Sequence, residues 1–289
     1  MLASSVYRGV VVPMVSPFTP AGRIDEPAVG RIVAHLLKGG VAGIFPLGTT
    51  GESASIRRED KRQLVSATVH AVHGRAMVYA GIAGNCFAES IDAAAEYRQL
   101  GADAVVAHVP SYYPLNDCEI ETYFERLADQ VPLPLVLYNI PSTTHHTIAL
   151  DSVDRLRQHP NIVALKDSAG DPQRITELLR RTGGRGGFPV LLGNSSQFTH
   201  GLKHGGVGLV PSGAHLVPEL YQSMFEAAMA DRWDAVEQLQ KQTDGVCAQY
   251  LGRSLGQGLA ALKALLEQRG LCGRTMLPPL IDHPHSGSS

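Results

Sequence analysis

One lysine stands at the end of a short, almost wholly apolar stretch of the chain, Asn161–Ser168. The stretch reads Asn-Ile-Val-Ala-Leu-Lys-Asp-Ser, which predicts a strand buried on both faces with Lys166 at its carboxyl end. Burial disfavours a charged lysine, and a neutral amine attacks carbonyl carbons, so Lys166 is a candidate nucleophile. The same side chain could instead reach out to solvent at the strand terminus or pair with Asp167.

Hydroxyl groups follow an earlier apolar run, in the sequence Gly-Thr-Thr-Gly-Glu at positions 48–52. Thr49 and Thr50 lie in a turn bracketed by glycines, and a predicted helix follows. Hydroxyls and free backbone N–H groups in such a turn can bind a small carboxylate. The alternative is an ordinary strand-to-helix turn in which a threonine caps the helix.

A tyrosine and a glycine end two further runs. Tyr138 is the penultimate residue of Leu135–Asn139, and its hydroxyl could relay a proton to a substrate. A buried tyrosine more often packs in the core with its hydroxyl hydrogen-bonded. Gly193 ends another run, and its missing side chain would leave room for a ligand.

These groups fit one reaction. Lys166 would attack the ketone of a 2-oxo acid and, after loss of water, form a protonated imine that makes the neighbouring C–H acidic. Tyr138 would carry the proton, and Thr49 and Thr50 would hold the carboxylate. The enamine could then add to an aldehyde or be reprotonated, so the chemistry needs no cofactor beyond the covalent lysine–pyruvate imine.

The elements that must position these residues alternate along the chain. Short β-like runs recur eight times, with segments of helical periodicity between them. This alternation predicts a (β/α)8 barrel, although a doubly wound sheet repeats the same units locally and no dinucleotide fingerprint is present. The expected strands are Val10–Val15, Ala42–Leu47, Met77–Ile82, Ala104–His108, Leu135–Asn139, Ile162–Lys166, Val190–Gly193 and Val207–Pro211.

The expected helices divide into those of the barrel and those that follow it. We expect the barrel to span residues 1–215, a C-terminal region of three helices packed on it to span 216–280, and a disordered tail to span 281–289. The barrel helices are expected at Glu26–Lys38, Arg58–His73, Phe87–Leu100, Ile120–Gln130, Leu150–Gln158 and Pro172–Arg181, and the later ones at Glu219–Ala230, Trp233–Leu251 and Gln257–Gln268.

Composition narrows the classes of function. The chain has 289 residues and a net charge of -2, with no basic stripe, so nucleic acid is not an expected partner. No apolar run approaches the roughly 18 residues of a membrane span and no signal-peptide pattern is present, which favours a cytoplasmic protein. The four cysteines form no C-x-x-C pair and are expected to be free thiols.

With these residues together, the sequence resembles the dihydrodipicolinate synthase/N-acetylneuraminate lyase family of class I, pyruvate-dependent aldolases. The likeness runs from about Val10 to Leu280. It rests on Gly-Thr-Thr-Gly-Glu at 48–52, Tyr-Asn-Ile-Pro at 138–141, Lys-Asp at 166–167, and the closing Ala261-Leu262-Lys263 with Leu277-Pro278-Pro279-Leu280.

The resemblance implies a barrel with a C-terminal helical appendage, assembled as a homotetramer of tight dimers. It implies that Lys166 forms the Schiff base to pyruvate and that Tyr138 is the catalytic tyrosine. It also implies that Thr50 links Tyr138 to a second tyrosine, Tyr113, which reaches into the neighbouring subunit's site. The expected substrate contacts are Thr49, Thr50, Gly193, Val210 and Thr143.

One position departs from the family pattern. The synthases that condense pyruvate with aspartate semialdehyde have an arginine where this chain has Thr143. A hydroxyl in place of a bidentate guanidinium loses about 1.5–3 kcal/mol, or roughly ten- to a hundredfold in affinity. We therefore expect a lyase or aldolase acting on an N-acetylneuraminate-like or 2-keto-3-deoxy sugar acid, with 4-hydroxy-tetrahydrodipicolinate synthase as the alternative. A dehydratase, which cleaves a carbon–oxygen bond, also stays open.

Two other classes remain as alternatives. A metal-dependent aldolase could use His200 and His204. The adjacent His145 and His146 could in principle also ligate a metal, but no carboxylates cluster with these histidines, so no metal site is expected. A ligand-binding relative without turnover would not need Lys166 together with two tyrosines.

Overall fold

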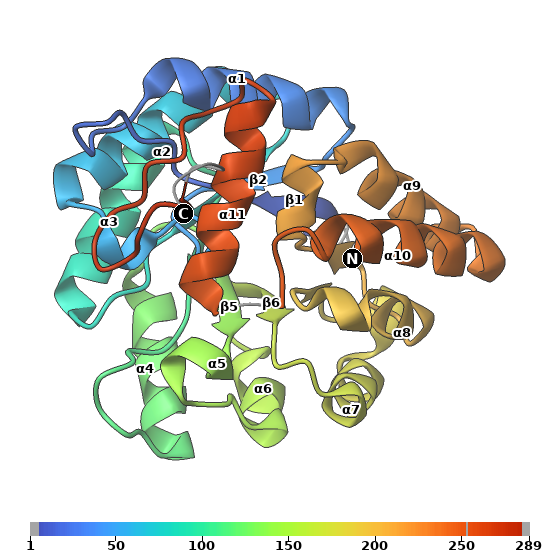
Figure 1. Cartoon of the computed structure of the whole chain (residues 1–289). Coiled ribbons are helices and arrows are strands. Elements are labelled where there is room, and N and C mark those ends of the chain that lie inside the picture. The colour runs from blue at the N-terminus through green and yellow to red at the C-terminus, as the bar shows by residue number, and fades with distance from the viewer. Residues whose placement is uncertain (1–5, 253, 285–289) are drawn as a thin grey trace.

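Eight parallel strands close into a barrel in the order in which they occur in the chain. The computed structural model describes residues 6–252 and 254–284. Strand β8 pairs with β1 through Gly9 and Gly208, which completes the barrel (Figure 1). The strands are β1 Gly9–Pro13, β2 Gly43–Phe45, β3 Met77–Gly81, β4 Ala104–Ala107, β5 Leu135–Asn139, β6 Ile162–Asp167, β7 Val190–Leu192 and β8 Gly208–Leu209.

All eight expected strands are therefore confirmed, and the differences lie at their ends. The second run was expected to continue to Leu47, but β2 stops at Phe45 because Leu47 takes a left-handed backbone conformation with φ of 62°. The sixth strand continues one residue beyond Lys166, to Asp167. Apolar composition extends into the turns, so it marks the strands better than it marks their limits.

The helices of the barrel begin and end at the residues that capping chemistry favours. Asp171 accepts hydrogen bonds from the backbone N–H groups of Gln173 and Arg174 ahead of Pro172, and Gly101 ends α3 with φ of 96°. The longer helices of the barrel are α1 Glu26–Lys38, α2 Arg58–Val72, α3 Phe87–Leu100, α4 Asp117–Gln130, α6 Leu150–Leu156 and α7 Pro172–Thr182.

Two short helices were not expected. They are α5, Pro141–Thr144, and α8, Phe198–Lys203. Neither is long enough to show a helical repeat of apolar residues, so the periodicity of the sequence could not predict them. Both follow strand ends that carry residues of the candidate site.

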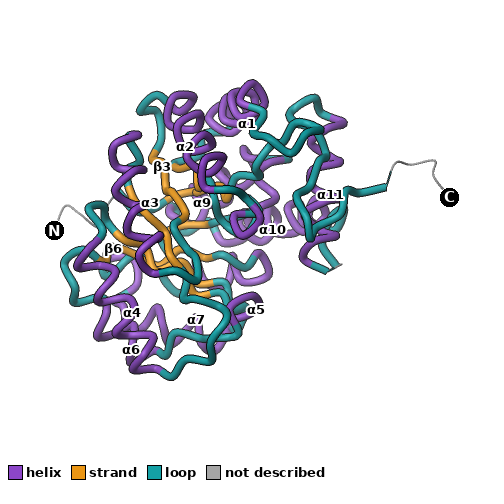
Figure 2. Tube along the Cα trace, turned by 90° about the vertical axis from the view of Figure 1, so that its left-hand side faces the viewer, coloured by secondary structure: helices purple, strands orange, loops and turns teal. Residues whose placement is uncertain are grey.

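Three helices follow the barrel, as expected: α9 Pro218–Met229, α10 Trp233–Cys247 and α11 Leu255–Gln268. Helix α9 contacts β1 and β8, so it also covers the closing strands of the barrel. Helix α11 stands in front of the strands, near the centre of the view in Figure 1, and Figure 2 shows it to one side of them. Of the predicted tail, residues 285–289 lie outside the described residues.

The core has two parts that are separated by the strands. A small cluster fills the inside of the barrel and includes Val11, Phe45, Val136, Tyr138 and Ala164. A larger cluster lies between the strands and the helices. Residues that alternate along a strand therefore face the two parts in turn. Within the described part of the chain, no helix is long and apolar enough to cross a bilayer.

Candidate active site

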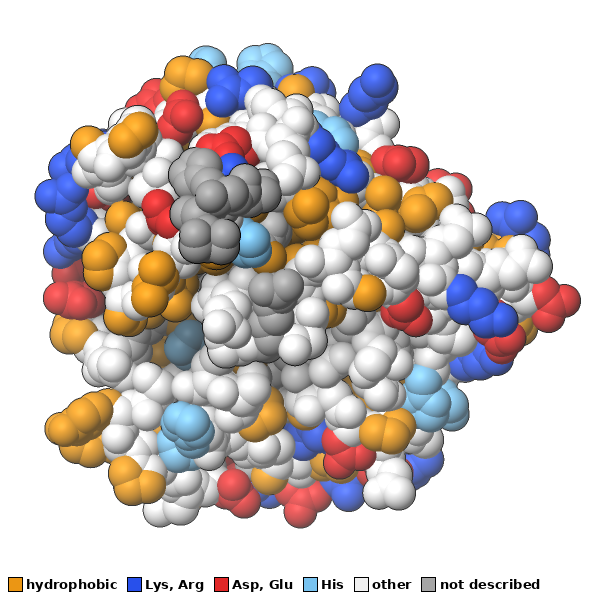
Figure 3. Space-filling view, in the orientation of Figure 1, with side chains coloured by type: hydrophobic (Ala, Val, Ile, Leu, Met, Phe, Trp, Pro, Cys, Tyr) orange, Lys and Arg blue, Asp and Glu red, His pale blue; other side chains and the backbone are white. Residues whose placement is uncertain are grey.

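A cavity of about 290 Å³ opens at the carboxyl ends of the strands. Its walls include Thr49 after β2, Tyr138 on β5, Lys166 on β6, Gly193 after β7 and Val210 after β8. The carboxyl ends of barrel strands are where TIM-barrel enzymes place their active sites. On the face shown in Figure 3, charged side chains of both signs are interspersed around the edge.

Lys166 lies at the bottom of this cavity, with 5% of its surface exposed. Its Nζ lies 3.7 Å from the centre of the Tyr138 ring and 5.0 Å from that of Phe45. Tyr138 and Lys166 are partners in the β5–β6 register, which places both side chains inside the barrel. The lysine amine is therefore held among aromatic rings and away from bulk water.

Tyr138 is surrounded by groups that favour its phenolate. Burial on its own raises the pKa of the Tyr138 hydroxyl, but the positive charge of Lys166 and polar contacts from Lys166, Thr49 and Ser168 outweigh burial and leave the pKa below its ordinary value. A tyrosine with a lowered pKa exchanges a proton more readily near neutral pH. The pair has the properties of a nucleophile beside an acid–base group.

The turn after β2 presents its hydroxyls to the cavity. Both Thr49 and Thr50 line the cavity, and the Thr49 Oγ1 lies 3.5 Å from the Tyr138 hydroxyl oxygen. The expectation that Thr50 contacts Tyr138 is corrected, because the turn directs Thr49 toward that hydroxyl. The Ser16 hydroxyl donates to the Gly51 carbonyl oxygen at 2.6 Å and anchors the turn to the segment that follows β1.

A buried ion pair holds the same turn from the opposite side. Glu52 has a left-handed φ of 55° and pairs with Lys263 of α11, and both side chains are almost wholly buried. Glu52 also accepts a hydrogen bond from the Leu277 backbone N–H at 3.0 Å, and the Lys263 ammonium donates to the Thr275 carbonyl oxygen at 2.8 Å. The C-terminal region is thus bonded to the Gly48–Glu52 turn of the barrel.

Gly193 gives Lys166 the space it occupies. A β-carbon at position 193 would lie 2.0 Å from the Ser168 Oγ and 3.0 Å from the Lys166 Cε. Any side chain at this position would therefore displace the lysine or the serine. Gly193 and Val210 both line the cavity, in the places where the sequence analysis expected substrate contacts.

The outer wall of the cavity was missed by the sequence analysis. It contains Ser212, together with Tyr250 and Leu251, which follow the end of α10, and Leu255 at the start of α11. The Ser212 Oγ and the Tyr250 hydroxyl oxygen lie 2.9 Å apart. The position of Tyr250 at the cavity depends on how the C-terminal helices pack on the barrel, and no local sequence pattern indicates it.

Two predicted site residues lie away from this cavity. Thr143 does not line it, although its neighbour Ser142 does, and the Thr143 hydroxyl donates to the Ile140 carbonyl oxygen at 3.4 Å. Tyr113 is 67% exposed and stacks edge-on against Tyr112. Tyr113 is therefore available to a partner subunit rather than to the cavity of its own chain.

His108 is a neighbour of the site that the sequence analysis did not single out. Its ring lies 6.1 Å from that of Tyr138, between centroids. Burial lowers the pKa of His108, a hydrogen bond with the Val109 carbonyl opposes that shift, and the charge of Lys166 lowers the pKa further. The ring next to Tyr138 is therefore a neutral imidazole at neutral pH.

Two of the histidines that were considered for a metal site lie next to each other. His200 and His204 stack with ring centroids 4.3 Å apart, and the Thr176 hydroxyl lies 2.8 Å from the His200 Nε2. Over the residues that the structure describes, no three His, Cys, Asp or Glu side chains gather as a metal site would require.

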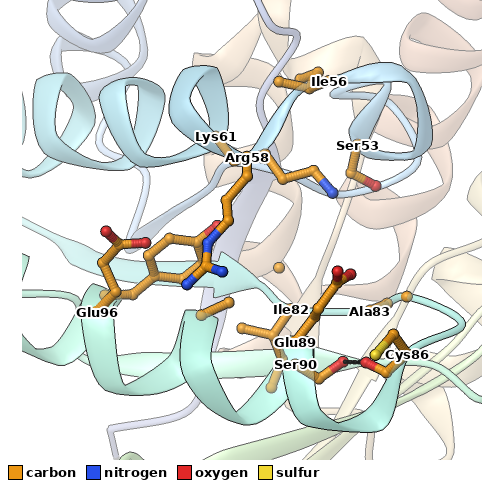
Figure 4. Close-up of a pocket in the computed structure, with 14 residues that line it drawn as sticks. Ser53, Ile56, Arg58, Lys61, Ile82, Ala83, Cys86, Glu89, Ser90 and Glu96 are labelled. Carbon is orange, nitrogen blue, oxygen red and sulfur yellow. Dashed lines mark hydrogen bonds between the residues drawn. The ribbon is translucent and has the colours of Figure 1, made fainter.

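A second cavity of about 290 Å³ lies between α2 and α3 (Figure 4). Arg58 and Lys61 approach it from α2, and Glu89 and Glu96 approach it from α3. Burial lowers the pKa of Lys61, and the charge of Glu89 opposes that shift. Because its walls contain neither Lys166 nor Tyr138, this cavity is separate from the candidate active site.

His215, next to the outer wall, gives the fold a specific acid sensitivity. Its Nε2 accepts the Val15 N–H at 3.0 Å, and its Nδ1 lies 2.8 Å from the Ser212 carbonyl oxygen, so the Nδ1–H tautomer satisfies both contacts. Burial lowers the pKa of His215 to about 4, against about 6.5 in the unfolded chain. Between those values the unfolded state binds more protons, so stability falls with falling pH.

We expect this histidine to remove about 3 kcal/mol from the free energy of unfolding between pH 6.5 and pH 4. Urea unfolding of the wild type and of His215→Gln over this range would measure the loss, with the exposed His70→Gln as the control. The free energy of unfolding of His215→Gln should change less with pH than that of the wild type or of His70→Gln. Identical slopes in all three proteins would contradict this assignment.

Comparison with known proteins places this site in a family. The model of the dihydrodipicolinate synthetase family matches residues 6–287. The chain belongs to this family. It is 34% identical to 4-hydroxy-tetrahydrodipicolinate synthase of Staphylococcus saprophyticus over 226 residues, covering 78% of this chain and 76% of the relative. It is 32% identical to the enzyme of that name from Phenylobacterium zucineum, covering 94% of this chain and 91% of the relative.

The solved structures agree with this membership. Dihydrodipicolinate synthase of Bacteroides thetaiotaomicron superposes with a TM-score of 0.91 at 30% identity, covering 96% of this chain and 94% of that one. The family and its relatives make this chain an enzyme of the lyase class, built on a TIM barrel.

Proposed function

We propose that the protein is a class I aldolase in which Lys166 forms a Schiff base with pyruvate. The observation that carries this proposal is the placement of the Lys166 Nζ 3.7 Å from the ring of Tyr138, at the bottom of a cavity lined by Thr49 and Thr50. A buried amine, an acid–base group and a carboxylate-binding turn are the three parts that this chemistry requires.

The reaction begins with attack of the Lys166 amine on the C2 carbonyl carbon of pyruvate. Proton transfers convert the adduct into a carbinolamine, which loses water to give the protonated imine. The imine then loses a proton from C3, and Tyr138 as phenolate accepts it. The resulting enamine attacks the aldehyde carbon and forms the new carbon–carbon bond, while the aldehyde oxygen takes the proton held by Tyr138. Hydrolysis of the product imine releases Lys166, and the reverse sequence is a lyase reaction.

Assembly into a homotetramer of tight dimers belongs to this proposal. Tyr112 and Tyr113 are 77% and 67% exposed, an unusual degree of exposure for adjacent aromatic side chains. Contact with a second copy of the chain would bury both rings and bring Tyr113 to the neighbouring site. The position of Tyr113 outside its own cavity supports this arrangement.

Two candidates remain for the aldehyde. The names of the relatives favour aspartate semialdehyde, as in 4-hydroxy-tetrahydrodipicolinate synthase, and support this alternative better than the sugar-acid cleavage that we expected first. The cavity itself favours cleavage of a sugar acid, in which the part that leaves as the aldehyde is neutral and hydroxylated. Of the described residues that line it, Lys166 alone carries a full charge, and Ser142, Ser212 and Tyr250 supply hydroxyls.

Replacing Thr143 with arginine tests the choice between them. If the chain is a sugar-acid aldolase, Thr143→Arg should raise kcat/KM for aspartate semialdehyde by roughly ten- to a hundredfold, because a guanidinium binds a carboxylate bidentately. If the chain is already a synthase, wild type should make the condensation product at a rate that Thr143→Arg does not improve.

The proposal itself is tested without any aldehyde. Wild-type protein in deuterium oxide should exchange the methyl hydrogens of pyruvate, which proton NMR follows directly, because the imine and enamine interconvert through this proton. Absence of exchange over the rate in buffer alone would overturn the proposed chemistry.

A further inference from the structure

An irregularity in the barrel lies just before the two residues of the proposed chemistry. Strands β5 and β6 pair Leu135 with Ile162, but the next pair is Val136 with Ala164, so Val163 is an extra residue on β6. Such a bulge places two successive residues of one strand opposite one residue of the other. Val163 and Ala164 both pack with the cluster inside the barrel, as this geometry requires.

The bulge decides which way Lys166 faces. In an unbroken ladder from Leu135 and Ile162, Tyr138 would oppose Leu165, and Lys166 would oppose Asn139. A one-residue slip reverses every side chain of a strand, so Lys166 would then point outward among the helices. The observed register, with Tyr138 opposite Lys166 and Asn139 opposite Asp167, is the one that puts both reacting groups in the cavity.

A buried polar network on the outer face matches only the observed register. The Asn139 Nδ2 donates to the Asp167 Oδ2 at 2.9 Å, and the Arg174 Nε of α7 donates to the same oxygen at 3.0 Å. The Asp167 Oδ1 accepts the Ala169 N–H, and the Asn139 Oδ1 accepts the Ile148 N–H, both at 3.0 Å. In the slipped register the carboxylate would leave the amide and the guanidinium without this partner.

We propose that Asn139, Asp167 and Arg174 are positioning residues that select the bulged register and thereby set Tyr138 against Lys166. This inference rests on the proposed function. Asn139 is 1% and Asp167 5% exposed, so water cannot replace a lost partner easily. None of the three residues lines the cavity. Asn139 and Asp167 each follow a reacting group by one residue and face the other side of the strands, where Arg174 of α7 meets Asp167.

The test compares two rates in pyruvate alone. Imine formation, measured by borohydride trapping, needs Lys166, whereas methyl exchange in deuterium oxide also needs Tyr138 at its proper distance. A misplacement of about 1 Å in such an arrangement costs on the order of a hundredfold. Asn139→Ala, which removes the cross-strand bond, should therefore lower the ratio of exchange to trapping at least about tenfold.

A control on the same strand pair separates positioning from stability. Asn161 lies before the bulge and donates to the carbonyl oxygens of Ala128, Val131 and Leu133. Asn161→Ala should lower the melting temperature and leave the ratio unchanged. A folded Asn139→Ala protein whose ratio equals that of the wild type would overturn the inference.

Arg174 provides the second pair of variants. Arg174→Lys retains a charged donor for Asp167, so its ratio of methyl exchange to imine trapping should lie within about threefold of the wild-type ratio. Arg174→Met has no such donor, and its ratio should fall at least about tenfold, as in Asn139→Ala. Equal ratios in the two Arg174 variants would contradict the inference even if Asn139→Ala does not fold. If the proposed Schiff-base chemistry itself were wrong, the wild-type protein would show neither imine trapping nor methyl exchange. That result is distinct from the results that would contradict the positioning role of Asn139 and Arg174.

Discussion

The Lys166→Ala protein should form no covalent adduct with pyruvate and should lose catalysis by at least about four orders of magnitude, the scale seen when an enzyme's nucleophile is removed. The reason is that Lys166 is the one lysine among the described residues that line the cavity, and the other buried lysine described, Lys263 of α11, is paired with Glu52. The replacement removes a side chain that packs against Phe45 and Tyr138 but leaves both rings in place. Mass spectrometry after borohydride treatment measures the adduct, and a coupled assay measures the rate.

Lys203→Ala is the matched control. Lys203 is half-exposed and pairs with Glu237 on the surface, so its loss should change neither the adduct nor the rate. A circular dichroism spectrum and melting curve close to wild type would show that Lys166→Ala is folded. A pyruvyl adduct that survives in folded Lys166→Ala would remove this lysine from the mechanism.

The Tyr138→Phe protein should still form the imine but should exchange the methyl protons of pyruvate at least about a hundredfold more slowly than wild type. A positioned proton-transfer group contributes on this scale, and phenylalanine keeps the ring while removing the hydroxyl. The structure gives this hydroxyl a lowered pKa through the charge of Lys166 and the polar contacts of Thr49 and Ser168, which together outweigh burial.

The pH profile offers an independent check on the same residue. Because exchange needs the phenolate, its rate in the wild type should rise with pH and level off below the ordinary pKa of tyrosine, about 10. Thr49→Val removes one of the contacts that lower this pKa, so it should move the rise to higher pH. Wild-type exchange rates in Tyr138→Phe would rule out the proton relay.

Much of the barrel could be predicted because each strand is a local feature. Apolar runs bounded by turns and by helical periodicity identified all eight strands, and the polar residue at the end of a run indicated Lys166 and Tyr138. Parallel strands bring their carboxyl ends to one rim, so residues far apart in the sequence could be assigned to one cavity.

The parts that could not be predicted depend on contacts between distant segments. Which of Thr49 and Thr50 meets Tyr138 depends on the left-handed conformations at Leu47 and Glu52, and local composition does not specify them. Tyr250 reaches the cavity only because α10 ends beside it.

The polar pairs of the fold show the same limit. Asp167 was considered a partner for Lys166 itself, whereas the structure turns Asp167 outward to Arg174 and Asn139. The sequence pattern does not show that Val163 is an extra residue in β6. Its effect on the direction of the following side chains is evident only from the pairing of β6 with β5.

The most direct test of the whole account is the intact mass of the wild-type protein after incubation with pyruvate and sodium borohydride, followed by peptide mapping. We expect a single reduced pyruvyl adduct, located on the peptide that carries Lys166. No adduct, or an adduct on another lysine with Lys166 unmodified, would contradict it.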